Sequence, residues 1–297
     1  MGQFSSLRKV RIIDTIFKIF VYCGAFITLI PLFLILYFIL TQGINYMTPY
    51  FFVTDAPPPI GDSEFFMMNS NQRIQAIGGI RNSLVGMFCI VSVASLVAMP
   101  FGISVAVFAS EHKKHKLAQL TLLCVDALQG IPSIIFGIIA NLWVVLTFKS
   151  YSALAGSAAL ALMMLPIIIK SSYETLILIP TSLKQSALAL GVPYSRVLFK
   201  VVLPSAAGGI SSGSLLGISR ILGETAPLLF TAFGTPFFTF DMTKPMETVA
   251  MQIYKNASSP NYNLIRNAWS ASLALVMLTL ILNLIIKPAI DKMKIKF

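Results

Sequence analysis

Charged residues are scarce in this chain, and their scarcity excludes a soluble globular protein. Only 11% of the 297 residues are charged, whereas 56% are hydrophobic, and the mean hydropathy is +0.82. A typical soluble domain carries about 25% charged residues, which it needs to cover its surface. The composition therefore predicts an integral membrane protein with one membrane domain.

The chain also lacks the residue patterns of common enzyme and metal sites. No run of the form GxxxxGK[ST] occurs, so we expect no ATP-binding loop here. Cys23, Cys89 and Cys124 lie in apolar stretches without metal-ligand spacing, and we expect buried packing residues rather than disulfides. His112 and His115 stand among lysines, whose charge repels a metal cation. We expect no catalytic residue, no metal and no cofactor bound by this chain.

Six apolar stretches are long enough to cross a bilayer. A helix needs about 20 residues to span the hydrocarbon, and an open chain in lipid must be helical to satisfy its backbone. The sequence therefore predicts an all-α membrane protein with six transmembrane helices. These lie at about 16–40, 83–109, 117–148, 153–169, 205–232 and 268–290.

The basic residues predict the orientation of these spans. If the amino terminus is inside, fifteen of the 22 Lys and Arg residues fall on the cytoplasmic side and six on the other, as the positive-inside rule requires. We expect a multi-pass protein of the cell inner membrane with both termini cytoplasmic. The net charge of +11 then reflects topology and contact with membrane lipid, not nucleic acid. Arg220 is left over, inside a span.

The predicted organisation has three parts. Residues 1–77 hold a basic head, the first span and a Pro-rich segment outside the cytoplasm; 78–290 form a five-helix core; 291–297 are a basic tail. The connection 41–79 carries three consecutive prolines, 57–59, and we expect it to be stiff and extended. It is either a linker or part of a docking rim for an external partner.

The stretch KQSALALGVPYSRVLFKVVLP (184–204) lies between two spans and predicts a compact helical elbow. Gly191 can take the positive φ that ends a helix, Pro193 cannot continue one, and we expect Pro204 to stop the second helix. That second helix is basic and amphipathic, with Arg196 and Lys200. A positively charged elbow at a membrane surface is suited to docking.

This elbow resembles the cytoplasmic loop shared by the membrane subunits of ABC importers. That loop reads Glu-Ala-Ala, any three, Gly, any nine, Ile-any-Leu-Pro; here Gln185, Ser186 and Ala187 stand at its first three positions, followed by Gly191 and Pro204. In that family the loop inserts into a separate ATPase subunit. The resemblance implies that 184–204 couples this chain to an ATPase, although Gln185 replaces the acid of the family.

Three ionisable residues lie within predicted spans. Asp126 is placed near mid-bilayer, beside a kink at Gly130 and Pro132, where a carboxylate costs about 2.5 to 3.5 kcal/mol. Arg220 and Glu224 are four residues apart and share a face of the predicted fifth helix. Such residues mark pathways, gates or structural ion pairs.

A second resemblance is more specific. The run GETAPLLFTA (223–232), with Arg220 upstream and DALQGIPSIIFGI at 126–138, resembles the PstA-type permease subunits of bacterial phosphate ABC importers, within the binding-protein-dependent transport system inner-membrane component family. The resemblance implies the ABC importer type I permease fold. It also implies a second homologous permease subunit, an ATPase dimer that uses ATP and Mg²⁺, and an extracytoplasmic phosphate-binding protein.

The residues alone leave several readings open. Arg220 and Glu224 either line a pathway or gate, hold helices together, or contact a partner permease, and Asp126 is more suited to a structural or gating role because a carboxylate repels phosphate. The substrate is phosphate or another oxyanion such as sulfate or molybdate. A mainly signalling role for phosphate is a further alternative. An ion-coupled carrier would need matched inverted repeats, which we do not find.

Overall fold

Long helices form the framework of the protein. The computed structural model describes residues 2–293, with the side chains of residues 13–288, and contains no β-strand within that range. Among these described residues, five helices are long and apolar enough to cross a membrane, and a bent pair makes up to six, as predicted. The five long helices are α1 (Gly2–Gly43), α5 (Arg81–Glu111), α9 (Ala153–Ile177), α12 (Leu203–Leu222) and α15 (Tyr262–Met293). The bent pair is α6 (Lys116–Gln129) and α7 (Ser133–Ala140), which continues through η2 (Asn141–Val145) and α8 (Leu146–Phe148).

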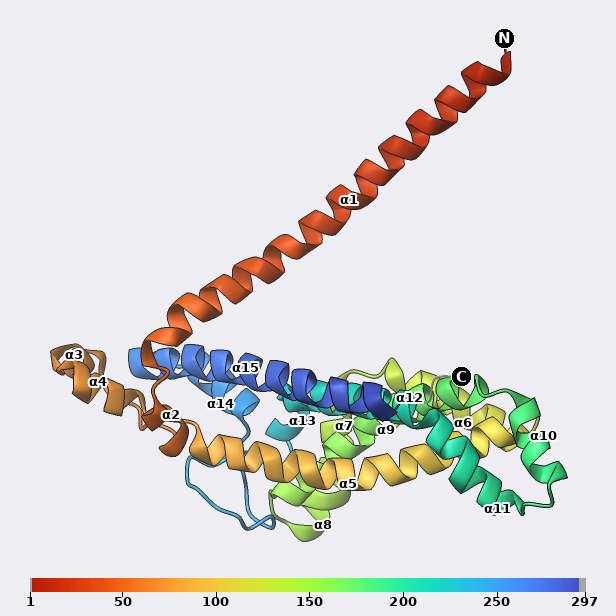
Figure 1. The fold of residues 1–297 in the computed structure, drawn as a ribbon. Helices are drawn as coiled ribbons and strands as arrows, with labels where there is room; N and C mark the ends of the chain where they lie inside the picture. The colour runs from red at the N-terminus through yellow and green to blue at the C-terminus, as the bar shows by residue number, and fades with distance from the viewer. Residues whose placement is uncertain (1, 294–297) are drawn as a thin grey trace.

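Helix α1 stands away from the other helices. Figure 1 shows that it meets the bundle only near its carboxyl end, beside α15. There the Ser270 hydroxyl donates to the carbonyl of Gly43 at 3.0 Å, and Arg266 bonds the side chain of Gln42. The apolar window of this span has none of its residues buried within the chain. The predicted basic head is part of this one helix, and its side chains up to residue 12 lie outside those described.

The core forms where α5, α9 and α12 pack together. Lipid is as apolar as the side chains, so these helices associate through close packing rather than through a hydrophobic driving force. On α5, Ala94 and Ala98 are completely buried. On α12, a Cβ added at Gly213 would lie 2.0 Å from the hydroxyl oxygen of Ser171 on α9. Small residues therefore allow these helices to approach each other closely.

The connection after α1 is a folded cap, not the extended segment we predicted. Residues 44–80 contain η1 (Ile44–Tyr46), α2 (Pro49–Val53), α3 (Asp62–Met67) and α4 (Ser70–Ile77), and only about 54–61 is extended. The prediction was wrong because it relied on the three prolines and did not account for apolar residues of this segment that pack into a core. Phe51, Phe65 and Ile77 are each 1% exposed.

Buried amides join this cap to α14 (Val249–Ala257) and to the start of α15. Gln252 donates to the carbonyl of Gly79 at 2.9 Å and to the Asn267 side chain at 2.9 Å. Asn267 donates to the carbonyl of Ile77 at 2.9 Å, and Asn263 to that of Pro58 at 3.0 Å. Because both amides at 252 and 267 are at most 1% exposed, these bonds satisfy groups that water cannot reach.

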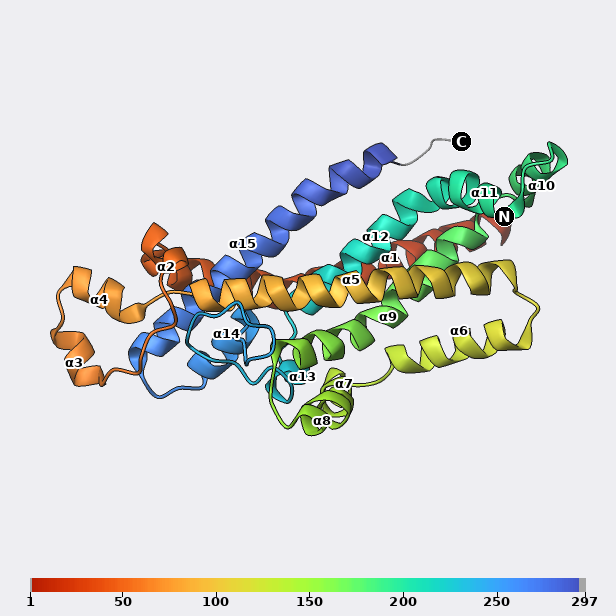
Figure 2. The same ribbon diagram turned by 90° about the horizontal axis from the view of Figure 1, so that it is seen from below.

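The cap and the elbow lie at opposite ends of the bundle. Figure 2 shows α3 and α4 at one end, and α10 (Thr181–Ala189) and α11 (Tyr194–Val197) at the other. The start of α1 and the end of α15 both lie toward the elbow end. This arrangement suits the predicted placement of both termini on one side of the membrane.

Three further expectations need correction. The fourth span continues to Ile177 instead of ending near residue 169, so Lys170 is inside a helix and not in a loop. The fifth helix ends at Leu222 instead of residue 232. Cys23 and Cys124 are exposed, whereas Cys89 is partly buried and packs against the core.

Candidate functional site

Arg220 lies in the last turn of α12. A cation is favoured there because the carbonyl groups at the end of a helix carry partial negative charge. Half of its side chain is exposed (51%). The sequence correctly placed this arginine inside an apolar helix, and the structure adds that it marks the helix end.

We had predicted Glu224 on the same helix as Arg220. It lies instead in a break of the chain between two helices. Helix α12 ends at Leu222 and is capped by Gly223, and the short helix α13 (Ala226–Leu229) follows. Pro227 explains the break, because it lacks the N–H that would bond to the carbonyl of Gly223 and its ring would clash with that carbonyl. The spacing of four residues suggested one helix, and the proline three residues later was the signal that should have ended it.

The two charges are close but do not form a tight ion pair. Arg220 Nε and Glu224 Oε1 are 3.9 Å apart, which exceeds hydrogen-bonding distance. The Glu224 carboxylate also interacts with the side chain of Ser133, the first residue of α7. A guanidinium held this loosely keeps donors free for another anion.

The break at Glu224 faces a second break, between α6 and α7. The two helices are bent by 108°, since Pro132 cannot continue α6 and instead precedes α7. Gly137 of α7 lies against the backbone of Pro227, where an added Cβ would be 2.5 Å from its Cα. The kink predicted at Gly130 and Pro132 is thus a sharp turn, and it brings α7 against α13.

Little space is enclosed by this chain at that point. The cavity that Arg220 shares with Gln129 and Ser133 measures only about 10 Å³. Such a space holds about one water molecule, so a tetrahedral oxyanion does not fit inside it. The exposed half of Arg220 is therefore the part able to meet an anion, at the outer surface of this chain.

Asp126 belongs to a different cluster. Its Oδ1 accepts from Lys170 Nζ of α9 at 2.7 Å, and this cation offsets the cost of placing the carboxylate in a membrane span. Sequence reasoning missed the partner because it ended the fourth helix at residue 169. The ion pair links α6 to α9.

The elbow, residues 184–204, has the two helices that the sequence predicted. Gly191 separates α10 from α11 with a φ of +77°, a conformation that L side chains rarely adopt. Gln185, Ser186 and Arg196 are exposed, and Ala187 is partly buried. Exposed apolar side chains accompany them, at Leu188, Leu190, Tyr194 and Phe199.

Pro204 does not stop the second helix of the elbow, contrary to our expectation. Residues 194–222 run on as a single candidate span, through the π-helical segment η3 (Leu198–Val202) into α12, where Pro204 occupies the first turn. Proline clashes with the carbonyl four residues before it, and a π-helical turn moves that carbonyl away. The elbow is thus continuous with the helix that carries Arg220.

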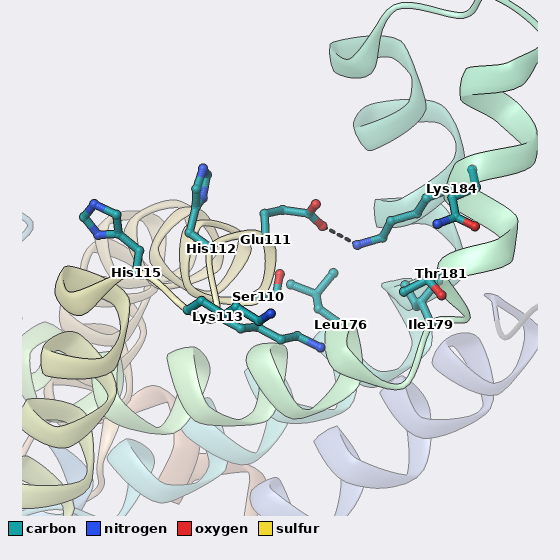
Figure 3. Close-up of a pocket in the computed structure, with 11 residues that line it drawn as sticks. Ser110, Glu111, His112, Lys113, His115, Leu176, Ile179, Thr181 and Lys184 are labelled. Atoms are coloured by element: carbon teal, nitrogen blue, oxygen red, sulfur yellow. Dashed lines mark hydrogen bonds and ion pairs between the residues drawn. The ribbon is translucent and has the colours of Figure 1, made fainter.

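An acidic residue outside the elbow faces it. Glu111, the last residue of α5, pairs with Lys184 of α10 (Figure 3). Glu111 also interacts electrostatically with the Tyr194 side chain of α11. No sequence pattern indicates this contact, because Glu111 precedes a basic turn and lies more than 70 residues before Lys184.

Comparisons with known proteins agree on the class of molecule. Residues 98–290 match the family described as "Binding-protein-dependent transport system inner membrane component". The chain is 34% identical over 261 residues to the phosphate transport system permease protein PstA of Yersinia pestis, covering 88% of this chain and 84% of that one. The PstA of Mycobacterium leprae is 32% identical over 281 residues, covering 94% and 88%.

The fold also has a counterpart among solved structures. The methionine ABC transporter MetNI, in an inward-facing conformation, contains a chain that aligns with a TM-score of 0.56 at 17% sequence identity. The alignment covers 76% of this chain and 99% of the other. At this identity the likeness concerns the fold alone, which is that of a type I importer permease.

Proposed function

The chain belongs to the family of binding-protein-dependent transport system inner membrane components, and on this premise we propose that it forms half of the membrane path for inorganic phosphate in an ATP-driven importer. The family consists of permease subunits and not of ATPases. Relatives that are named phosphate permeases match most of the chain. Arg220 is the residue that would bind the anion. Its planar fork of donors suits a tetrahedral oxyanion.

Arg220 acts at the edge of the path in this proposal. Its exposed half would bind the anion, while Glu224 at 3.9 Å weakens that binding, because a conduit must release what it binds. The two breaks at 130–132 and 223–225 leave polar backbone groups at membrane depth. Such groups are tolerated where they line a cavity or lie buried in protein.

A second permease subunit would close the path from the other side. The cavity of about 10 Å³ beside Arg220 is too small for the anion, so the path needs walls from another chain. Helix α1 offers a contact, since its apolar side chains are unburied and it extends away from the bundle (Figure 1). The partner is a homologous permease on this proposal.

ATP hydrolysis by a separate ATPase dimer would drive transport through the elbow. Gln185, Ser186, Ala187 and Arg196 are the contact residues on this proposal, with Gly191 forming the bend between them. Pro204 lies where the elbow runs into α12. This chain binds no cofactor; ATP and Mg²⁺ act in the partner. A phosphate-binding protein would dock at the cap, outside the cytoplasm.

Labelled phosphate uptake tests the proposal. Cells without a permease of this type receive this chain and its genomic neighbours, with sulfate and molybdate as competitors. We expect ATP-dependent uptake that unlabelled phosphate blocks and the other anions do not. Blocking by sulfate or molybdate would change the substrate and keep the architecture, and an assembled complex without uptake would favour a signalling role.

Variants of Arg220 test the site itself. Arg220→Ala should lower uptake by about a hundredfold or more, because it removes charge-assisted hydrogen bonds worth about 3 kcal/mol. Arg220→Lys, the matched control, keeps the charge and loses the fork, so we expect partial activity. Both variants should assemble normally. Loss of assembly in Arg220→Ala would indicate a structural ion pair instead.

A further inference from the structure

The first helix of the elbow has almost no apolar anchor. None of the residues of α10 (Thr181–Ala189) is buried. Ala187 is its contact with the neighbouring apolar cluster, to which α5, α6, α9, α11 and α12 contribute, and Leu188 remains 42% exposed. Packing alone therefore does not determine where α10 lies.

A single carboxylate holds both helices of the elbow. Glu111, at the end of α5, accepts from Lys184 of α10 and interacts electrostatically with Tyr194, the first residue of α11. The side chains of Lys184 and Glu111 are only 19% and 14% exposed. This pair is shielded more than an ordinary surface ion pair, and so solvent screens it less.

The ion pair crosses an open gap. A cavity of about 720 Å³ lies between the turn after α5 and helix α10, and Figure 3 shows Glu111 and Lys184 reaching toward each other from the two sides. His112 and Lys113 line the α5 side, and Thr181 and Gln185 the α10 side. Since no packed side chains fill this gap, polar contacts join the two sides there.

We propose that Glu111 is the positioning residue of the elbow: by holding Lys184 and Tyr194 it fixes α10 and α11 against α5 and passes their movement to that helix. The proposal rests on the proposed function, since it assigns the elbow to ATPase docking. The elbow is also continuous with α12 through η3. A push on α10 and α11 therefore reaches α12 through the backbone and α5 through Glu111.

Substitutions in a complete complex test this role. The chain is reconstituted in proteoliposomes with its partner permease, ATPase and binding protein, and the transported substrate per ATP hydrolysed is measured. We expect Glu111→Gln and Lys184→Gln each to lower this ratio by about tenfold, as loss of a charged hydrogen bond predicts. The double variant Glu111→Lys with Lys184→Glu should recover most of the loss, because it restores the pair with reversed polarity.

Lys113→Gln is the matched control. It removes the same charge from the lining of the same cavity, and Lys113 makes no ion pair with any described residue. We expect its ratio to stay within about twofold of the wild type. An equal loss in Lys113→Gln and Lys184→Gln would overturn the proposal in favour of a general effect of positive charge.

The assembly of each variant complex and the phosphate uptake of the wild-type complex distinguish the remaining outcomes. If Glu111→Gln does not assemble, Lys184→Gln and Tyr194→Phe carry the test, because both leave the carboxylate in place. An unchanged ratio in assembled Glu111→Gln, or no recovery in the reversed pair, would overturn the positioning role. A wild-type complex that hydrolyses ATP but imports no phosphate would contradict the proposed function. The affinity of the ATPase for each variant still tests the elbow in that case.

Discussion

Gly191 shows how one backbone angle shapes the elbow. Its φ is +77°, yet a Cβ built on it meets no atom within 4 Å. The constraint is therefore conformational and not steric. The left-handed angle costs a residue other than glycine about 1 to 2 kcal/mol, and it costs Asn less.

Gly191→Val should therefore weaken coupling to the ATPase while the protein still inserts and assembles. The β-branched side chain resists the positive φ and shifts the angle between α10 and α11. We expect substrate-stimulated ATP hydrolysis and uptake to fall together. Gly191→Asn, which accepts the same angle, serves as the control. Full activity of the valine variant would show that the elbow does not dock.

Glu247 predicts a pH dependence at the cap end of the molecule. It is 5% exposed, and burial raises its pKa above the usual value of 4.5, although Lys255 at 3.0 Å opposes the shift. As pH rises above 4.5, the unfolded chain releases this proton before the folded chain does. The contribution to the free energy of unfolding is therefore present at low pH and declines as pH rises through the folded pKa.

The measurement compares thermal unfolding of the wild type and Glu247→Gln in detergent. As pH falls from neutral to about 4.5, the Tm of the wild type should rise relative to that of the glutamine variant, which cannot titrate. A difference between the two proteins that is constant with pH would mean that Glu247 keeps its usual pKa.

At the scale of elements, the contact of α7 with α13 holds the two chain breaks together. A Cβ added at Gly137 would lie 2.5 Å from the Cα of Pro227, and backbone does not yield as a flexible side chain does. Gly137→Ala should therefore cost about 1 to 3 kcal/mol and displace Glu224 from Ser133. We expect a lower Tm together with reduced uptake.

Gly130→Ala is the matched control for this prediction. It lies at the other break, but the nearest atom to its added Cβ is at an ordinary contact distance of 3.5 Å. We expect wild-type Tm and uptake. If both alanine variants behave alike, close packing at Gly137 is not what holds the breaks in place.

Spans could be predicted from the sequence, whereas their breaks and partners could not. Hydropathy detects about 20 apolar residues in a row, and it located both ends of α5 to within two residues. It located the end of α15 to within three residues, but α15 begins six residues before the predicted start. Hydropathy does not detect a turn inside an apolar stretch, and for this reason the predicted fifth span continued past the end of α12 at Leu222. Hydropathy also does not detect contacts between residues distant in sequence, such as Lys170 with Asp126 or Glu111 with Lys184.

The elbow could be predicted because it depends on local chemistry. Gly191 ends α10 and Pro193 precedes α11 as the residue types require. The cap was mispredicted for the opposite reason. Its fold depends on Asn263, Asn267 and Gln252, which lie some 170 to 205 residues later in the chain.

At the scale of the whole molecule, the arrangement of the ends predicts the topology. The start of α1 and the end of α15 lie toward the elbow (Figure 2), and most Lys and Arg residues were assigned to that side. Fluorescent-protein fusions to either terminus should therefore fluoresce, while alkaline phosphatase fusions should be inactive. A phosphatase fusion after Gly61, in the cap, should be active and serves as the control. Activity at either terminus would contradict the orientation.

The cap also imposes an order on the making of the protein. Residues 44–80 leave the ribosome early, but the amide that bonds the carbonyl of Pro58 belongs to Asn263, 205 residues later. A growing chain therefore carries an unfinished cap until the start of α15 has been synthesised. Chains truncated before α15 would keep this segment open to proteases, so closure of the cap shows that translation has passed Asn263.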